Sequence, residues 1–285
     1  MSLTAALASQ EALVSLEAGG PDPALQLAGR FLAAGDFDAA VTEYKRYIFF
    51  SATAGDPQLS EAYRDIGLAF RSQGRWAEAR EALNNSIQSA SDEQFRDLRR
   101  IDLAVVEIAA GNRSAAEFLL VKVEMFSRDE AVKRRAAFFR GVCALYGGEW
   151  DKAGEAFAAH FNSATDHDFL ARLQELLARA KKRRLKSPIL AKWMSILLPG
   201  SGQIYSGYWG NGLNALVING ALGYLLVKDL LDRQAGSFIF NTIFLFSRFY
   251  LGNIHIAKDL ANRRNQELKR RAAADVMDLL QERLQ

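Results

Sequence analysis

Two apolar segments in the last third of the chain stand out from the otherwise mixed pattern of hydrophobic and polar positions. Residues 210–227 and 235–257 carry almost no charge, and the short polar turn KDLLDRQ joins them. As helices they would rise about 27 Å and about 35 Å, against a hydrocarbon thickness of about 30 Å. The second segment has phenylalanines around much of its circumference and lacks a polar face. The pattern predicts a helical hairpin that spans a membrane; the alternative is a buried hairpin in a soluble protein.

Basic residues flank both ends of these segments, whereas the turn between them has balanced charge. The flanking residues are Lys181, Lys182, Arg183, Arg184, Lys186 and Lys192 before them, and Lys258, Arg263, Arg264, Lys269, Arg270 and Arg271 after them. By the positive-inside bias, we expect both ends in the cytoplasm and the turn outside. The same clusters would meet anionic lipid headgroups, which disfavours a nucleic-acid interpretation of KKRRLK.

The charge of the whole chain is divided unevenly between its two parts. Residues 1–180 contain 20 Lys+Arg against 26 Asp+Glu, net −6, and residues 181–285 contain 16 against 7, net +9. An acidic front part and a basic, apolar back part predict a water-soluble module fixed to a membrane. The first residues, MSLTAALASQ, lack a basic n-region, which disfavours a secretory signal, although Ala6-Leu7-Ala8 resembles a cleavage site.

A short phrase, Gly-x-aromatic-x-x-Ala, recurs between residues 23 and 161, where apolar residues follow helical spacing. Its copies begin at Gly35, Gly74, Gly111 and Gly148, which lie 39, 37 and 37 residues apart, and the third copy has Arg113 in place of the aromatic residue. A period in this range, with a helix on either side of each glycine, indicates stacked helical hairpins.

These four copies resemble tetratricopeptide repeats of slightly long period. A small residue in each first helix would let a bulky residue of the second helix approach closely. The small residues are Ala28, Gly67, Ala104 and Gly141, and the bulky ones are Tyr44, Leu83, Leu120 and Phe157. The resemblance implies a concave groove for peptides or partner helices, lined by Arg64, Leu68, Arg71, Ile101, Val105, Ile108, Phe138, Val142 and Tyr146. For Phe138 and Val142, packing on the following helix is the alternative.

The segment SPILAKWMSILLPGSGQIYSGYWGNG is similar to the signature Pro-Gly-x-Gly-Gln-x-Tyr-x-Gly of a family of small bacterial membrane domains with two transmembrane helices. The matching residues are Pro199, Gly200, Gly202, Gln203, Tyr205 and Gly207, and the similarity extends through Arg248 to Asn262. We expect a short helix that breaks at Pro199, with glycines that permit close packing. Arg248 is expected to snorkel toward the basic flank rather than pair with Asn214 or Asn219.

No combination of residues in the sequence predicts catalysis, a cofactor or a metal site. Ser201 lacks the Gly-x-Ser-x-Gly context of a nucleophile elbow, and no Gly-Lys-Ser/Thr follows the glycines. The three histidines have no ligand partners at metal-binding spacing. Cys143, on a helical pattern, is expected to be a small buried side chain.

The sequence therefore predicts an all-α chain in which a tetratricopeptide-like helical solenoid precedes a transmembrane helical hairpin. The expected parts are an N-terminal segment (1–22), four repeats (23–161), a capping or linker helix (162–187), a two-helix membrane domain that starts with a glycine-rich loop (188–257) and a basic amphipathic helix (258–285). The last helix would lie on the membrane or on the repeats.

We expect a non-enzymatic scaffold or adaptor, anchored in the inner membrane of a bacterium with the solenoid in the cytoplasm, or in the periplasm if an export signal precedes this sequence. Its expected partners are a protein or peptide, membrane lipids and other copies bound through the hairpin, but not nucleic acid. The alternative function is a membrane transport or envelope-assembly component whose oligomerised hairpin handles a lipid or solute.

Overall fold

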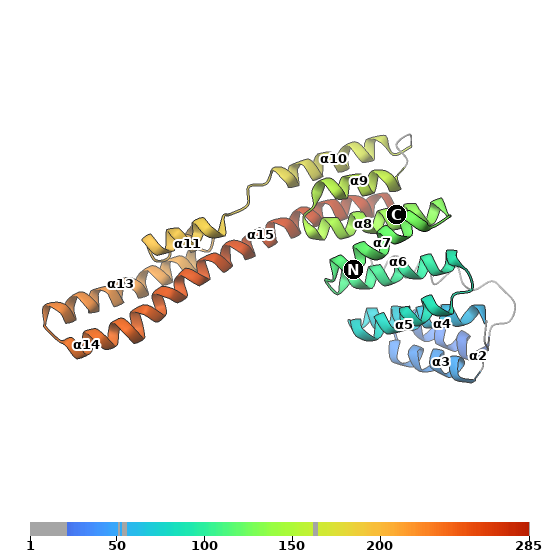
Figure 1. Ribbon diagram of the computed structural model, residues 1–285, viewed down its shortest axis with the longest axis horizontal. Coiled ribbons are helices and arrows are strands. Elements are labelled where there is room, and N and C mark those ends of the chain that lie inside the picture. The colour runs from blue at the N-terminus through green and yellow to red at the C-terminus, as the bar shows by residue number, and fades with distance from the viewer. Residues whose placement is uncertain (1–21, 51, 53–55, 162–164, 285) are drawn as a thin grey trace. The chain divides into compact units, whose positions relative to one another are not determined.

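The computed structural model describes residues 22–50, 52, 56–161 and 165–284, and the regular elements in these ranges are all helices (Figure 1). The all-α class is thus confirmed. The chain divides into two compact units, one of residues 1–177 with 277–285 and the other of residues 178–276. The front module and the glycine-rich segment therefore belong to different units.

The first unit begins with helices that follow one another in pairs (Figure 1). The pairs are α2 (Pro23–Ala34) with α3 (Phe37–Phe50), α4 (Pro57–Ser72) with α5 (Trp76–Ser89), α6 (Glu93–Ala109) with α7 (Arg113–Phe126), and α8 (Glu130–Gly147) with α9 (Trp150–His160). Each of these helices contacts the next along the chain, and α6 also contacts α4 and α8. The pairs therefore stack in a series.

A glycine in the left-handed conformation separates the two helices of every pair. Gly35, Gly74, Gly111 and Gly148 have φ angles of 78°, 72°, 84° and 73°. Residues with a side chain rarely adopt this backbone conformation, whereas glycine adopts it without steric cost. The turns expected from the recurring phrase are confirmed, including the third, which lacks the aromatic residue.

An aspartate begins each first helix, a regularity that the sequence analysis missed. The side chains of Asp22, Asp56, Asp92 and Asp129 accept hydrogen bonds from backbone N–H groups of α2, α4, α6 and α8. Such caps satisfy N–H groups that have no partner inside the helix, and each contributes about 1 kcal/mol. The recurrence of aspartate is a periodic signal that places each helix start.

The small and bulky residues expected to meet in each pair are buried together. Ala28 and Tyr44 belong to one core cluster, and Ala104 and Leu120 to the next. A Cβ atom added at Gly141 would lie 2.7 Å from the Phe157 ring. The missing side chain at such a position sets how closely the two helices approach.

The C-terminal end of the long helix α15 (Ser247–Leu284) belongs to the first unit. There Arg283 donates hydrogen bonds of 2.6 and 3.0 Å to the buried carboxylate of Asp166, just before α10 (His167–Lys182). Leu279 and Leu280 are buried nearby in the sequence. The C-terminal helix was expected to lie either on the membrane or on the repeats. Its last residues belong to the first unit, with the packed helices of the front part.

The second unit contains the two apolar segments and the glycine-rich segment. Its elements are α11 (Pro188–Leu197), α12 (Ser201–Tyr205), α13 (Trp209–Leu231), α14 (Ala235–Phe240), the π-helix η2 (Asn241–Phe246) and most of α15. Among the described residues, α13 is the helix that is long and apolar enough to cross a membrane. It contacts α14 and η2, which follow the turn at its end.

The helix after the turn differs from the expected single span. Residues 235–257 are helical throughout, but they change from α14 to the π-helix η2 and then to α15. The boundary expected at residue 258 also lies inside α15, which continues without a break. The reason is local: from residue 258 to residue 284 the chain contains no glycine or proline and is rich in Ala, Leu, Glu, Lys and Arg, which favour helices.

We predict that Gly141→Ala destabilises the first unit by about 1–3 kcal/mol, because the new methyl group must displace the rigid ring of Phe157. The matched control is Gly29→Ala, inside α2, where nothing lies within 4 Å of the added atom. This control is expected to be neutral or to stabilise the helix. Thermal unfolding in detergent, followed by circular dichroism, measures both; equal shifts would contradict the close contact.

Candidate functional site

The expected groove residues do not form an open groove along their whole length. Leu68, Ile101, Phe138 and Val142 are buried in the protein core. Phe138 makes an edge contact with Phe157, at 5.7 Å between ring centroids. Phe138 and Val142 therefore pack inside the protein, which was the alternative considered for them. Buried side chains offer no surface to a partner.

The other expected groove residues are more accessible. Arg71, Val105 and Ile108 are half-buried, and Tyr146 near the end of α8 is exposed. Arg64 is also half-buried, and its Nε donates to Asp102 on α6 at 3.0 Å. The accessible remainder of the expected groove is therefore small and partly polar.

Ion pairs connect the first helices of successive repeats. Asp102 on α6 is buried and lies 3.0 Å from Arg64 on α4, 3.3 Å from Arg99 and 4.0 Å from Arg135 on α8. Arg99 also pairs with Glu61 on α4. Buried charges cost free energy unless they are paired, so these contacts hold the three helices in one register rather than leaving charge for a ligand.

A second layer of this network reaches α3. The Tyr44 hydroxyl donates to Asp65 at 2.8 Å. Burial raises the pKa of the Asp65 carboxyl, while the neighbouring Arg64 opposes that shift; burial and the contact with Asp65 also raise the pKa of Tyr44. At neutral pH the tyrosine therefore keeps its proton and donates this hydrogen bond, which suits a structural contact.

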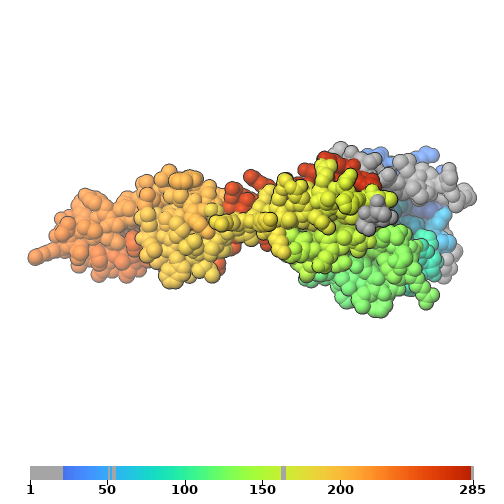
Figure 2. Space-filling view, turned by 90° about the horizontal axis from the view of Figure 1, so that it is seen from above, coloured from blue at the N-terminus to red at the C-terminus, as the bar shows by residue number. Residues whose placement is uncertain are grey.

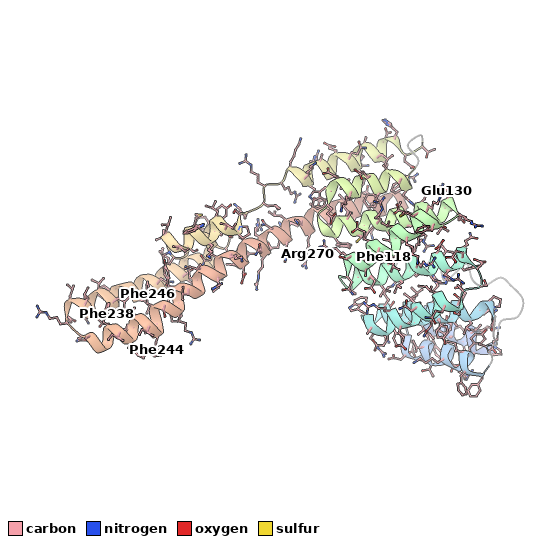
Figure 3. All side chains as sticks on the ribbon, viewed as in Figure 1. Phe118, Glu130, Phe238, Phe244, Phe246 and Arg270 are labelled. Carbon is pink, nitrogen blue, oxygen red and sulfur yellow. The ribbon has the colours of Figure 1, made fainter. Side chains whose placement is uncertain are left out.

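An exposed apolar surface of the first unit lies on α7, where the sequence analysis did not place a binding site. Phe118, which Figure 3 labels, Met125 and Phe126 are each about two-thirds or more exposed, and Val121 is partly exposed. Together with Ser114, Glu117 and Lys122 they line a shallow hollow. We call these seven residues the α7 surface. In the sequence, the available sign of this surface was the helical spacing of its large apolar side chains.

The glycines of the glycine-rich segment lie at close backbone contacts between its helices. Gly200 has a φ of 93°, and a Cβ atom there would lie 2.1 Å from the carbonyl oxygen of Gly212 on α13. A Cβ atom at Gly202 would lie 2.0 Å from the carbonyl oxygen of Ala191 on α11. The expectation that these glycines serve packing is met by this geometry, and Pro199 stands at the break between α11 and α12.

Gln203 is the polar centre of this segment and is only 1% exposed. Its Oε1 accepts from Ser195 on α11 at 2.9 Å, and its Nε2 donates to the backbone oxygen of Asn253 on α15 at 3.2 Å and to the Asn253 side chain. The Ser195 hydroxyl in turn accepts from the N–H of Gly202 at 3.1 Å. We call Ser195, Gly202, Gln203 and Asn253 the Gln203 cluster.

The Gln203 cluster therefore ties three helices together through one side chain. Asn253 was missed in the sequence, although Asn253, Ala257 and Ala261 recur at intervals of four on α15 and all three are buried. Ala257 and Ala261 pack with Ala191 and Tyr205. A buried amide with both ends bonded holds its neighbours in one arrangement, and its loss leaves unpaired polar atoms.

The C-terminal end of the segment that matches the signature, Tyr205 to Gly207, includes residues outside this cluster. The Tyr205 hydroxyl accepts from the N–H of Ser187 at 3.1 Å, and Lys186 lies over the Tyr205 ring at 4.6 Å. Gly207 is exposed, with a φ of 90°. Arg248 is also exposed on α15, and Asn219 donates to the carbonyl oxygen of Ala215, so the alternative pairing of Arg248 with Asn219 is not adopted.

A buried carboxylate lies near the turn between the apolar helices. Asp229 on α13 is buried and accepts from Asn241 at 2.7 Å, at the start of η2. Asn241 also donates to Ser237 at 3.3 Å. This pair connects α13 with η2 at the end of α13.

Cys143 and Ser201, the other side chains considered for chemistry, make structural contacts. Cys143 is buried, and burial raises the pKa of its thiol above the usual range. Ser201 donates to the backbone oxygens of Met194 and Leu198 at 2.7 Å, as a helix-start contact. Within the described ranges, no three His, Cys, Asp or Glu residues lie close enough together to hold a metal ion.

Comparison with known protein families, with characterised proteins and with solved structures finds no match to this chain. Its function must therefore be argued from its own geometry.

We predict that Gly202→Ala disrupts the second unit, at a cost of about 3 kcal/mol or more, because the methyl group would overlap backbone atoms of α11 that cannot move aside. Gly210→Ala and Gly220→Ala are matched controls, since nothing lies within 4 Å of an added Cβ atom at either position. Limited proteolysis in detergent reports the fold. Resistance of the Gly202→Ala protein equal to that of the controls would contradict the tight contact.

Proposed function

We propose that this protein is a membrane-anchored scaffold, whose front module of tetratricopeptide-like repeats recruits a protein partner and whose second unit holds it at a lipid bilayer. The proposal keeps the function expected from the sequence and moves the binding surface. It includes no catalytic activity and no cofactor.

The observation that carries the membrane anchor is the distribution of polar and apolar residues on α13. The buried residues of this helix are Gly212, Asn219 and Asp229, whereas Leu213, Val217, Tyr224 and Leu230 are exposed. A helix of a soluble protein has the opposite arrangement. Apolar side chains that face outward and small or polar ones that face the next helix are typical of helices in lipid.

The helix after the turn has the same character. Ile239, Phe240, Ile243 and Phe244 are all more than half exposed around α14 and η2, where Figure 3 labels Phe244. Contiguous apolar surface of this extent on a soluble monomer is unusual. The basic clusters on both sides of the two helices support a cytoplasmic location for the front module, and we propose a bacterial inner membrane as its site.

The partner-binding role is supported by the stacked pairs and by the α7 surface. Stacked helical pairs expose long surfaces on which partners bind. On the α7 surface, Phe118, Met125 and Phe126 are exposed, and Glu117 and Lys122 line the same hollow. Aromatic residues and methionine are enriched in the centres of protein interfaces, and charged residues at their rims. The partner that fits is a protein segment with an apolar face.

Transport or envelope assembly through an oligomerised hairpin is the less supported function. The observation that most favours this function is the pairing of Asp229 with Asn241 at the start of a π-helix, since π-helical turns often occur at functional sites. The pair lies near the end of α13, however, and transport sites lie near the middle of the bilayer. We therefore favour the anchor.

The topology is tested by labelling intact cells with a membrane-impermeant thiol reagent. Single cysteines at Gln234, in the turn, and at Gln88, on α5, are both exposed positions, and Cys143→Ser removes the native thiol. We expect labelling at Gln234 and none at Gln88 until the cells are opened. Labelling at Gln88 in intact cells would mean that the front module is exported.

The binding surface is tested by replacing Phe118 and Met125 with serine. We expect the double variant to weaken partner binding about 10-fold to 100-fold, as loss of central apolar contacts does, without lowering the unfolding temperature. A photoreactive side chain at position 118 first identifies the partner by crosslinking in cells, and one at the exposed Gln88 is the matched control. Identical adducts at both positions, or unchanged binding, would refute the assignment to α7.

A further inference from the structure

Helix α11 has an outward face that is as apolar as its inward face. Ile189, Trp193 and Leu197, at intervals of four residues, are 68%, 59% and 85% exposed. On the opposite side, Ala191 and Ser195 are completely buried. Figure 2 shows the segment that contains α11 uncovered by the rest of its unit.

The orientation of this helix is held by its inward contacts. Ala191 packs with Ala257 and Ala261 of α15, and the Ser195 hydroxyl bonds both Gln203 and the N–H of Gly202. A rotation that buried Trp193 would break these contacts. The apolar face is thus a fixed feature of the unit and needs a partner of its own.

The length and ends of α11 exclude a spanning arrangement. Its 10 residues rise about 15 Å, half of the hydrocarbon thickness. Ser187 caps its start, where the hydroxyl accepts from the N–H of Leu190 at 3.2 Å, and the helix ends before Pro199 and the left-handed Gly200. A short helix with an apolar face and defined ends is suited to lie along a surface.

The charges around α11 identify that surface. The sequence has no acidic residue between Glu175 and Asp229, while Lys182, Arg184 and Lys192 are exposed at or near α11. The acidic groups that face the basic run from α15 are already paired, Asp275 with Arg183 at 3.2 Å and Glu267 with Arg264 at 3.2 Å. The net charge is positive, which is complementary to anionic headgroups.

We propose that α11 lies in the plane of the membrane interface and binds an anionic leaflet. Ile189, Trp193 and Leu197 enter the upper acyl-chain region, where tryptophan is favoured, and the exposed lysines and arginine contact lipid phosphates. This proposal rests on the proposed membrane anchor, since α13 begins shortly after α11 and would cross the same bilayer. It adds a lipid preference and a depth to that anchor.

The test measures the depth of Trp193 in the full-length protein, with Trp76→Phe, Trp150→Phe and Trp209→Phe leaving it as the only tryptophan. The protein is reconstituted into phosphatidylcholine vesicles with or without phosphatidylglycerol, and the lipids carry bromine at a shallow or a deep acyl position. We expect blue-shifted emission, quenched more by the shallow bromine and more in the anionic vesicles. A protein with Trp76 of α5 as its only tryptophan is the control and should not be quenched.

The charge contribution is tested by replacing Lys182, Arg184 and Lys192 with glutamine in the same protein. We expect each lost charge to lower the insertion equilibrium of α11 in anionic vesicles about fivefold. Emission typical of water, strongest quenching by the deep bromine, or equal quenching in both kinds of vesicle would overturn the proposal. Resistance to alkaline carbonate extraction is measured separately: release would refute the spanning helices, while the depth of Trp193 would still decide the placement of α11.

Discussion

Helix backbones in this protein approach most closely where one of them lacks a side chain, and both units depend on that approach. In the first unit Gly67 and Gly141 admit Leu83 and Phe157, and in the second unit Gly200 and Gly202 contact backbone carbonyl oxygens of neighbouring helices. A methyl group at any of these positions would overlap its neighbour. Packing at this density tolerates little added volume, so the glycines determine the spacing of the helices around them.

The two units pair their buried polar groups in different ways. The first unit places paired charges between successive helices, with Asp102 in contact with arginines from three helices. The second unit has few buried charges, and its central polar contact is the amide of Gln203, which bonds Ser195 and Asn253. If the second unit lies in lipid, as we propose, no water competes for such bonds and none replaces a lost one, so bonding at both ends of the Gln203 amide suits that setting.

The proposed function follows from what each unit leaves exposed. The α7 surface offers exposed apolar groups beside charged ones, and the second unit exposes apolar side chains on α11, α13, α14 and η2. These surfaces call for different partners, because the first is small and rimmed by charge whereas the second is extensive and flanked by basic residues. A scaffold that joins a protein to a membrane accounts for both.

The all-α class, the four helical pairs with their glycine turns, and the residues that meet within each pair could be predicted from the sequence. These features depend on local rules: glycine is tolerated in the left-handed turn, and helical periodicity places small and bulky residues at regular positions. The break at Pro199 and the packing role of the glycines were predictable for the same reason. The recurring aspartate caps carried an equally local signal that the sequence analysis overlooked.

Only the tertiary structure decided which side chains are accessible. Ile101 on α6 and Phe138 and Val142 on α8 are buried, although more accessible residues lie on the same helices. Their burial depends on how tightly the next helical pair packs, and no local pattern in the sequence specifies that. The contact of Gln203 with Asn253 joins residues 50 positions apart. The sequence by itself thus determined the helices and their close contacts, because local geometry controls both, whereas the exposed faces and the long-range polar contacts depend on the packing of the whole unit.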